Sequence, residues 1–351
     1  MSYLNLTNST NLNQLGYDQE IAKKITIADN QKIIELDELE RTLKKLKDRS
    51  VKFVILGVPE GIGPYANKGR NGAYGAWPAF LNQFRNRLKE EVCNKIILLG
   101  NVYLADLQRK SEYYDNEREK DRKELRRMVG QIDDRFAPLI RTIFRAGLIP
   151  VVIGGGHNNA YPLIREAAQL QDNSISCINL DLHADLRETD GRHSGNSFSY
   201  GFENDLLDKY YIFGLYENYH SEKYFDKVKT MQQEGKIDFS TYDQITKRFE
   251  NSFRNEINRA INWLKNENVK ELGLEVDLDS VEGVPASAIT EVRIPLSFTL
   301  DFVARISTDF APIYFNISEG APVLGKRNSK KVVGDIVCTL IEKFITAIAA
   351  I

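Results

Sequence analysis

Residues 177–187 read Cys-Ile-Asn-Leu-Asp-Leu-His-Ala-Asp-Leu-Arg and join an apolar, strand-like run to three polar side chains at alternate positions. In an extended chain successive side chains point to opposite faces. Asp181, His183 and Asp185 therefore project from one face, and the apolar side chains between them point to the other. Two carboxylates and an imidazole on one face of a strand end form half of a metal site.

Two further segments have the same pattern, an apolar strand with metal-binding side chains at its carboxyl end. His157 follows the run 148–153 through three glycines, and Asp277 and Asp279 follow the run 272–276. In a parallel sheet such ends converge on one edge, where open α/β folds bind their ligands. The pooled candidate metal ligands are His157, Asp181, His183, Asp185, Asp277 and Asp279.

Four carboxylates in one crevice repel one another, by about 4 kcal/mol for a like pair about 4 Å apart at an effective dielectric of about 20. Two divalent cations would balance the four charges. Oxygen ligands mixed with imidazole favour Mn²⁺ over a structural zinc, for which thiolates are expected. Two ions about 3.5–4 Å apart can hold a bridging hydroxide near neutral pH. One such segment is often an ordinary turn, but three that each end an apolar strand favour the metal site.

Apolar strands and amphipathic helices alternate along the chain, which predicts a three-layer α/β/α fold with a mostly parallel sheet. The expected strands are 51–57, 95–100, 148–153, the run that begins at Cys177 and leads into Asp181, 210–215, 272–276 and 313–317. The expected helices are 36–47, 79–88, 117–146 (with Pro138 as a kink or break), 253–264 and 333–348. Residues 51–351 are predicted to form one catalytic domain. Residues 1–50 are predicted to be an extension packed on it, with a polar loop at 5–13 and then a possible strand.

Composition excludes several classes of protein. The chain has 351 residues and a net charge of −2, so it lacks the basic surface of a nucleic-acid-binding protein. No apolar run reaches the roughly 18 residues that a membrane span needs, and the polar amino terminus is unlike a signal peptide. Three scattered cysteines without metal spacing indicate a cytoplasmic protein. The glycine-rich loop 61–75 lacks the Gly-Lys-Ser/Thr of a phosphate-binding loop.

The three metal segments resemble the metal-binding signatures of the ureohydrolase (arginase) family in order and in all six ligand positions. The runs 57–59 and 67–73 are similar to that family's first strand and its loop. The resemblance covers roughly residues 50 to 347. It implies an arginase-like fold, a centre with two Mn²⁺ ions, and hydrolysis of a C–N bond in a small guanidino or amidino compound. Relatives commonly form homo-oligomers.

The loops beside the metal segments resemble formimidoylglutamases more than arginases. Arg187 stands where arginases carry an asparagine, and a guanidinium there could bind a carboxylate through two hydrogen bonds. Phe198 stands where arginases place a histidine. Ser194 and Asn196 are expected to hydrogen-bond the amino-acid end of the substrate. His193 does not align with the arginase histidine and is expected to lie at the surface.

The end of the last strand also resembles the family. Glu319 begins a Glu-Gly-Ala-Pro sequence similar to the family's Glu-x-x-Pro, whose glutamate holds the cationic group of the substrate. Two positions depart from the pattern. Asn158 follows the metal histidine where Glu or Ser is usual, and the run 280–285 replaces the Asp-Pro that often follows the second Asp-x-Asp.

The resemblance therefore predicts hydrolysis of N-formimidoyl-L-glutamate to L-glutamate and formamide, a step of histidine degradation. Asp185 would orient the attacking hydroxide and pass its proton to the departing amine. Arg187, Ser194 and Asn196 would hold the glutamate carboxylates. The alternatives are an arginase, agmatinase or other guanidino-acid hydrolase that releases urea, or a metal-binding protein without turnover.

Overall fold

The computed structural model describes residues 3–27, 35–87, 89–246 and 252–349. Within these ranges nine strands form one sheet in the order β1-β3-β2-β4-β9-β8-β5-β6-β7. Only β1 runs antiparallel to its neighbour. The strands are β1 (Leu4–Leu6), β2 (Phe53–Gly57), β3 (Ile96–Val102), β4 (Ile149–Ile153), β5 (Ile175–Leu180), β6 (Leu207–Leu215), β7 (Ile237–Thr241), β8 (Leu272–Asp277) and β9 (Tyr314–Ser318).

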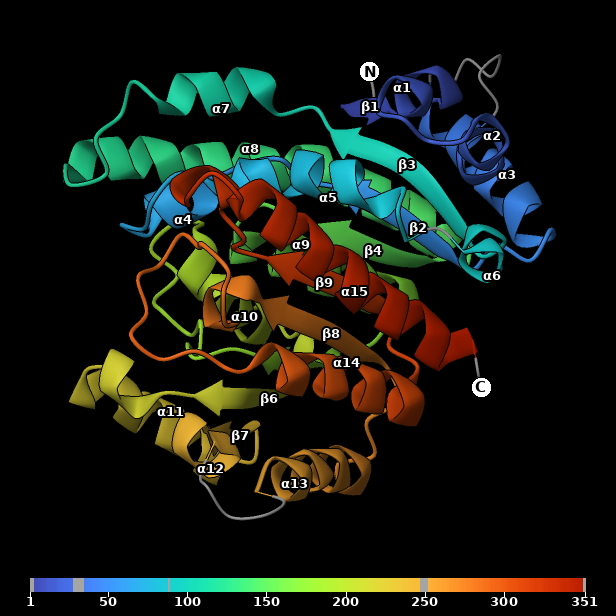
Figure 1. Cartoon of the computed structure of the whole chain (residues 1–351). Coiled ribbons are helices and arrows are strands. Elements are labelled where there is room, and N and C mark those ends of the chain that lie inside the picture. The colour runs from blue at the N-terminus through green and yellow to red at the C-terminus, as the bar shows by residue number, and fades with distance from the viewer. Residues whose placement is uncertain (1–2, 28–34, 88, 247–251, 350–351) are drawn as a thin grey trace.

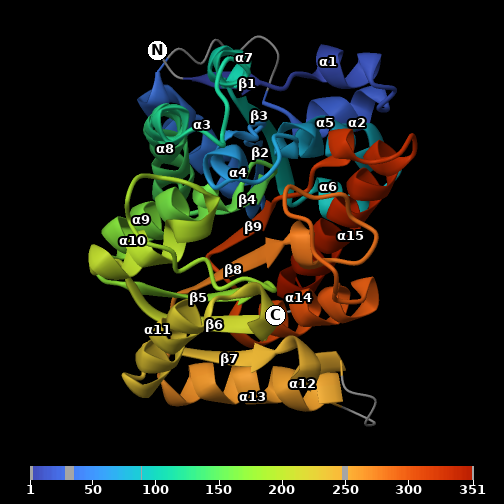
Figure 2. The same ribbon diagram turned by 90° about the vertical axis from the view of Figure 1, so that its left-hand side faces the viewer.

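Helices cover both faces of this sheet, so the predicted three-layer α/β/α fold is confirmed. One layer contains α3 (Leu36–Lys47), α8 (Glu119–Arg145), α9 (Ala160–Gln171), α10 (Ser197–Glu203) and α11 (Glu222–Gln233). The other contains α2 (Gln19–Ile25), α5 (Ala76–Phe84), α6 (Glu90–Cys93), α13 (Ser252–Asn266), α14 (Leu296–Phe310) and α15 (Ser329–Ala349). Figure 2 shows α8, α9, α10 and α11 on one side of the sheet and α6, α14 and α15 on the other. Shorter helices are α1 (Ser9–Gln14), α4 (Ile62–Ala66), α7 (Ala105–Ser111) and α12 (Tyr242–Thr246).

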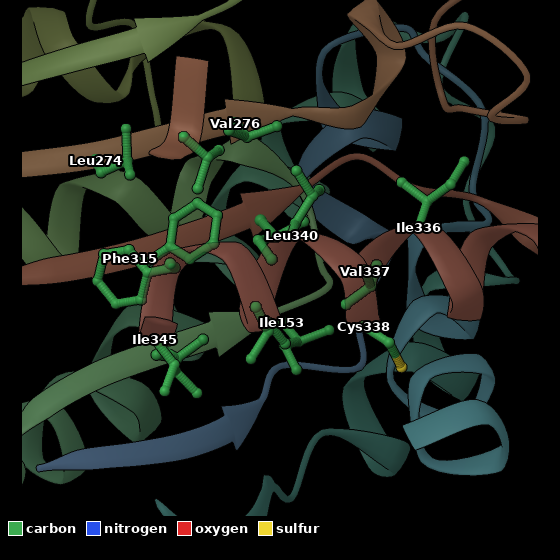
Figure 3. Close-up of a cluster of buried hydrophobic side chains, with 14 of the residues drawn as sticks. Ile153, Leu274, Val276, Phe315, Ile336, Val337, Cys338, Leu340 and Ile345 are labelled. Atoms are coloured by element: carbon green, nitrogen blue, oxygen red, sulfur yellow. The ribbon is translucent and has the colours of Figure 1, made fainter. Parts of the chain in front are cut away.

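Two apolar cores, one on each face, hold the layers together because the central strands are apolar on both faces. Phe53 and Ile55 of β2 enter one core, whereas Val54 and Leu56 enter the other. Figure 3 shows α15 packed on the central strands, with Leu340 and other apolar side chains of α15 facing Val276 of β8, Phe315 of β9 and Ile153 of β4. Burial of each such side chain contributes roughly 1.5–3 kcal/mol.

Several expected elements differ from the observed ones. The stretch 5–13 is not simply a polar loop, because β1 pairs with β3 and α1 follows it. The possible strand after residue 13 is also wrong where the chain is described, since α2 occupies 19–25; residues 28–34 lie outside the described ranges. Helix α5 begins and ends earlier than predicted, and residue 88 is not described. Helix α8 continues through Pro138, whose neighbours Ala137 and Leu139 are both buried, so Pro138 does not divide the helix, which was one of the two predicted alternatives.

The metal segments follow β4, β8 and β5, three of the four adjacent strands near the middle of the sheet. Strands β4, β9, β8 and β5 are adjacent and parallel, so their carboxyl ends share one edge. In Figure 1 the arrows of β6, β8 and β9 point to the same side of the molecule. Within the described residues, no helix combines the length and the apolarity that crossing a membrane requires.

Candidate metal centre and active site

The six candidate ligands come together at the carboxyl edge of the sheet, in two groups that share one residue. The first group contains His157, Asp181, Asp185 and Asp277, and the second contains Asp181, His183 and Asp279. Within each group the ligand atoms lie within 4.8 Å of one another. Asp181 belongs to both groups, so its carboxylate would help to hold both ions.

The first group is arranged around one nitrogen of His157. Its Nδ1 lies 2.9 Å from Asp185 Oδ2, 3.2 Å from Asp277 Oδ2 and 3.5 Å from Asp181 Oδ2. Among the described residues neither ring nitrogen of His157 has a well-aligned hydrogen-bond partner, although the ring is fully buried. The nitrogen and the three carboxylate oxygens converge on one point without forming hydrogen bonds to one another. This arrangement is suited to binding one cation.

The second group is arranged around His183, with Nδ1 3.4 Å from Asp181 Oδ1 and 3.5 Å from Asp279 Oδ2. Neighbouring donors fix the carboxylates. Asn179 Nδ2 donates to Asp181 Oδ2, and the Ser280 hydroxyl lies 3.1 Å from both Asp181 Oδ1 and Asp279 Oδ1. Removing a group that orients a metal ligand in this way typically costs about 10- to 100-fold in metal affinity or activity.

A buried carboxylate, Glu275, lies behind His157. Its Oε2 is 3.4 Å from His157 Nε2, and it accepts hydrogen bonds from the Tyr314 hydroxyl and the Asn316 amide. A carboxylate behind a histidine ligand favours the tautomer whose other nitrogen faces the metal. Glu275 was not selected from the sequence, although it stands two positions before Asp277 and so on the same strand face.

The turn that carries His157 depends on glycine and on a second buried acid. Gly155 has φ +76°, and a Cβ there would lie 2.8 Å from the Val58 carbonyl oxygen. Glu60 is fully buried and accepts hydrogen bonds from the N–H groups of Ile62, Gly63 and Gly156. Burial raises the pKa of Glu60, and these three donors oppose that rise. Through these hydrogen bonds, Glu60 connects the loop after β2 to the turn that positions His157.

Glu60→Gln is expected to lower the free energy of unfolding by about 2 kcal/mol, because an amide NH₂ would face backbone donors inside the protein. Chemical denaturation of both proteins measures the difference. Glu119→Gln is the matched control, since Glu119 is exposed and forms an ion pair with Lys123 at the surface. Equal losses in the two variants would contradict this role for Glu60.

Without cations the acidic cluster retains protons that an unfolded chain would release. Burial and the Asp279 charge raise the pKa of Glu319 to about 8. Burial also raises the pKa of Asp185, and burial with the neighbouring carboxylates raises that of Asp277 well above its usual range. For His157, burial lowers the pKa, but the surrounding carboxylates outweigh it and raise the pKa well above the ordinary value. The folded metal-free site therefore binds more protons than the unfolded chain near neutral pH.

The metal-free protein is expected to lose stability as pH rises from about 5 to 8.5. The acids with raised pKa values, and the histidine with its raised pKa, all bind more protons when folded, so the free energy of unfolding falls as pH increases. We expect the Tm of EDTA-treated protein to drop on the order of 5 °C across this range. Excess Mn²⁺ should reduce or reverse the drop, because metal ligands bind deprotonated. A metal-free Tm that stays constant would contradict the crowded acidic site.

A pocket of about 770 Å³ opens beside this cluster, and three of the four predicted substrate residues line it. Arg187 is exposed at its rim, and no acidic side chain pairs with its guanidinium in the part of the chain that is described. The Ser194 hydroxyl accepts a hydrogen bond from Asn67. Glu319 is buried, accepts a hydrogen bond from the His157 N–H and has φ +63°. Asp185 also has a positive φ, +49°, and such strained residues cluster at functional sites.

The structure does not bring Asn196 to this pocket. Its side chain is fully buried, accepts from Arg192 and the His193 N–H, and donates to the carbonyls of Glu188 and Gly191. These bonds use both ends of the amide, so Asn196 fixes the loop that presents Ser194 rather than facing a substrate.

The expectation that His193 lies at the surface is wrong. Only 2% of its area is exposed, and its Nδ1 accepts the Gly195 N–H at the start of the turn 194–196. Burial, with the Arg126 charge, lowers the pKa of His193 to about 3. His193 caps the turn 194–196 only once the loop has folded, so no periodic pattern in the sequence predicts this role.

Sequence reasoning also missed the far wall of the pocket, which follows β6. Tyr219, His220 and Tyr224 line it. The Tyr219 ring stacks on His183 with 5.5 Å between centroids, and the Tyr224 hydroxyl accepts the Leu186 N–H. Burial and the His183 charge lower the pKa of His220 to about 4. His220 is one of only four histidines in the chain, and that rarity was the available signal.

Comparisons with known proteins agree with this geometry. The chain is 25% identical over 282 residues to the formimidoylglutamase of Streptococcus pyogenes serotype M3, with 77% of each chain covered. It is 28% identical over 232 residues to that of Staphylococcus carnosus, with 65% of each covered. Its fold matches a Trypanosoma cruzi formiminoglutamase solved with Mn²⁺ (TM-score 0.65, 20% identity, 88% of this chain and 98% of the other). It also matches the Bacillus subtilis formimidoylglutamase (TM-score 0.65, 15% identity, 97% and 93%). The model of the Arginase family matches residues 51–293, which is more than half of the chain, and the protein therefore belongs to the arginase family.

Proposed function

We propose that this protein is a manganese-dependent hydrolase that converts N-formimidoyl-L-glutamate and water into L-glutamate and formamide. The observation that carries the proposal is the convergence of six His and Asp side chains beside a pocket lined by the Arg187 guanidinium, which no acidic side chain of the described residues pairs with. Membership of the arginase family and the formimidoylglutamases among its relatives support the same chemistry.

Two Mn²⁺ ions fit the donor set. His157, Asp181, Asp185 and Asp277 would hold one ion, and Asp181, His183 and Asp279 would hold the other. Imidazole with several carboxylates suits manganese, and no cysteine contributes to either group among the described residues. When bound, the two ions would supply a water activated for attack near neutral pH and would stabilise the negative charge that develops.

The chain's own groups would position the substrate and move its proton. Glu319 supplies a buried carboxylate for the cationic amidine. The Asp185 carboxylate, which faces the pocket, would take the proton of the attacking water and pass it to the departing amine. Arg187 and the Ser194 hydroxyl would hold the glutamate carboxylates. Asn196 contributes indirectly, by fixing the loop of Ser194.

Two alternatives are less well supported. An arginase or agmatinase would release urea, but the position where arginases place a histidine holds Phe198, which is buried against Tyr210 with 4.0 Å between ring centroids. A metal-binding protein without turnover would need no open pocket beside the cluster. The pocket, with Arg187 on its rim, favours catalysis on an acidic amidine.

The proposal also covers the cellular location, the partners and the oligomeric state of the protein. A cytoplasmic location would keep the three free cysteines reduced, and all three are buried. We expect a small-molecule substrate and neither a nucleic-acid nor a membrane partner. Size-exclusion chromatography with light scattering tests the homo-oligomer that is common among relatives.

A substrate panel tests the proposed reaction. Manganese-loaded protein is offered N-formimidoyl-L-glutamate, arginine, agmatine and other guanidino acids while formamide, ammonia and urea are measured. We expect formamide and glutamate from the first compound and little urea from the others. Urea release from a guanidino compound at a higher kcat/KM would favour the alternative, and no turnover of any compound would favour a non-catalytic role.

A further inference from the structure

Lys68 lines the active-site pocket, but none of the roles proposed above uses it. Its side chain is exposed, and within the described ranges its ammonium group has no hydrogen-bond or ion-pair partner. The guanidinium of Arg187 is free in the same sense. The other two arginines of the lining are occupied, because Arg126 pairs with Asp190 and Arg70 donates to two backbone carbonyls. The pocket thus offers two available cations, and the proposed substrate carries two carboxylates.

The backbone at Lys68 has a conformation that favours glycine. Lys68 follows α4 and has φ +65°. Its N–H donates to the Tyr65 carbonyl, and the Gly69 N–H donates to the Pro64 carbonyl. This pair of bonds is typical of helix ends at which the left-handed residue is usually glycine. A lysine there costs free energy relative to glycine, because its Cβ is crowded. Such strained residues cluster at functional sites.

The turn that contains Lys68 lies against the loop of Ser194 and beside Arg187. Asn67 Nδ2 donates to the Ser194 hydroxyl over 3.3 Å. A Cβ on Gly195 would lie 2.7 Å from Asn67 Nδ2 and 3.0 Å from Arg187 Cδ. The residue before Lys68 and the side chain of Arg187 therefore flank the same glycine. The two available cations come from adjacent segments of the pocket wall.

The same turn also packs on the turn that carries a metal ligand. A Cβ on Gly156 would overlap the ring of Pro64, and Gly156 directly precedes His157. Lys68 is thus fixed close to the metal centre, whereas Arg187 lies at the rim of the pocket. In N-formimidoyl-L-glutamate the α-carboxylate is attached to the carbon that bears the amidine nitrogen. It therefore lies nearer to the reacting carbon than the side-chain carboxylate does.

We propose that Lys68 binds the α-carboxylate of the substrate while Arg187 binds its side-chain carboxylate, so that the pocket selects amidines with two negative charges. The inference rests on the proposed function, since that substrate class supplies the two anionic groups. Lysine suits this position because its compact charge and rotatable N–H donors, on a flexible stem, adapt to a carboxylate without a fixed geometry. Lys68 is thus a specificity-determining residue and takes no part in the chemical step.

A pair of substrates tests the contact. N-formimidoyl-γ-aminobutyrate keeps the amidine and the distal carboxylate but lacks the α-carboxylate. Lys68→Met keeps most of the stem and removes the charge. For N-formimidoyl-L-glutamate we expect kcat/KM in K68M to fall about 10- to 30-fold, chiefly through KM. For the aminobutyrate it should stay within about 2-fold of the wild type. An equal loss for both compounds, or no loss for either, would overturn the proposal.

Lys68→Gly separates binding from a structural role. Because glycine suits the left-handed backbone, the Tm of K68G should equal that of the wild type or exceed it by about 1–2 °C. Its kcat/KM for N-formimidoyl-L-glutamate should nevertheless fall as in K68M. A lower Tm together with lower activity on both compounds would assign Lys68 a structural role and contradict the proposal. K68R, which keeps the charge, should stay within about 5-fold of the wild type.

Lys110→Met is the matched control. Lys110 is an exposed lysine of α7 and does not line the pocket. Its replacement should leave kcat/KM for both compounds within about 2-fold of the wild type. A loss in K110M that is as large as the loss in K68M would show that the effect does not come from the pocket, and it would overturn the proposal.

The outcome for Lys68 can be distinguished from the outcome for the proposed function. If the manganese-loaded wild type leaves N-formimidoyl-L-glutamate intact, the proposed reaction fails, and the compound becomes a non-reacting ligand. Its Kd and that of the aminobutyrate are then measured by calorimetry for the wild type and K68M. Weaker binding of the glutamate compound alone in K68M supports the contact. Equal binding to both proteins, or no binding to either, overturns it.

Discussion

Asp181→Asn is expected to lower kcat/KM by about 10³-fold or more, which corresponds to about 4 kcal/mol of transition-state stabilisation. Asp181 is the one residue shared by the two groups of candidate ligands, so the substitution removes a negative charge from both ions. The new amide would also direct N–H groups toward existing donors, because Asp181 already accepts from Asn179, Ser280 and the His183 N–H. Steady-state kinetics and metal analysis after gel filtration should show both the lost activity and fewer than two retained manganese ions.

Asp309→Asn is the matched control for this experiment. Asp309 lies on α14, pairs with Lys265 and takes no part in the pocket. Its replacement should leave the manganese content at two ions and kcat/KM within about 2-fold of the wild type. An Asp181→Asn protein that retains both ions and full activity would show that Asp181 does not help to hold both ions.

The ligand set could be predicted from the sequence because two simple regularities determine it. Side chains at alternate positions of a strand share a face, and the carboxyl ends of parallel strands share an edge. Together they bring His157 after β4, Asp181 after β5 and Asp277 at the end of β8 to one place, as the structure has them. Glu275 and Asn179 obey the same alternation and could have been included.

Features that depend on loop packing could not be predicted in the same way. The burial of His193 and the internal bonds of Asn196 arise because the loop 188–197 folds against α8 and α9. Single residues of a loop form no periodic pattern that would predict this packing. The placement of His220 requires the order of β5 and β6 in the sheet. Strand β1 has only three residues, too few to show alternation, and its pairing with β3 comes from tertiary contacts.

Arg187→Ala is expected to lower kcat/KM for N-formimidoyl-L-glutamate by about 100-fold or more, chiefly through a higher KM. A guanidinium that grips a carboxylate through two charge-assisted hydrogen bonds contributes several times the free energy of a neutral bond. Arg187 is suited to this role because no acidic side chain competes for it within the described residues and because it lines the pocket beside Ser194. Arg187→Lys should recover part of the loss, since an ammonium keeps the charge but not the paired geometry.

A substrate change makes the test specific to the carboxylate. N-formimidoyl-L-glutamine replaces the side-chain carboxylate by an amide of similar shape, so the wild type should process it less efficiently than the acid. If Arg187 binds that carboxylate, the Arg187→Ala protein should have nearly equal kcat/KM values for the two compounds, because it lacks the contact that distinguishes them. Arg127→Ala, which removes an exposed arginine of α8 outside the pocket, should keep the wild-type preference. An Arg187→Ala protein with an unchanged KM and an unchanged preference for the acid would assign carboxylate recognition to another residue.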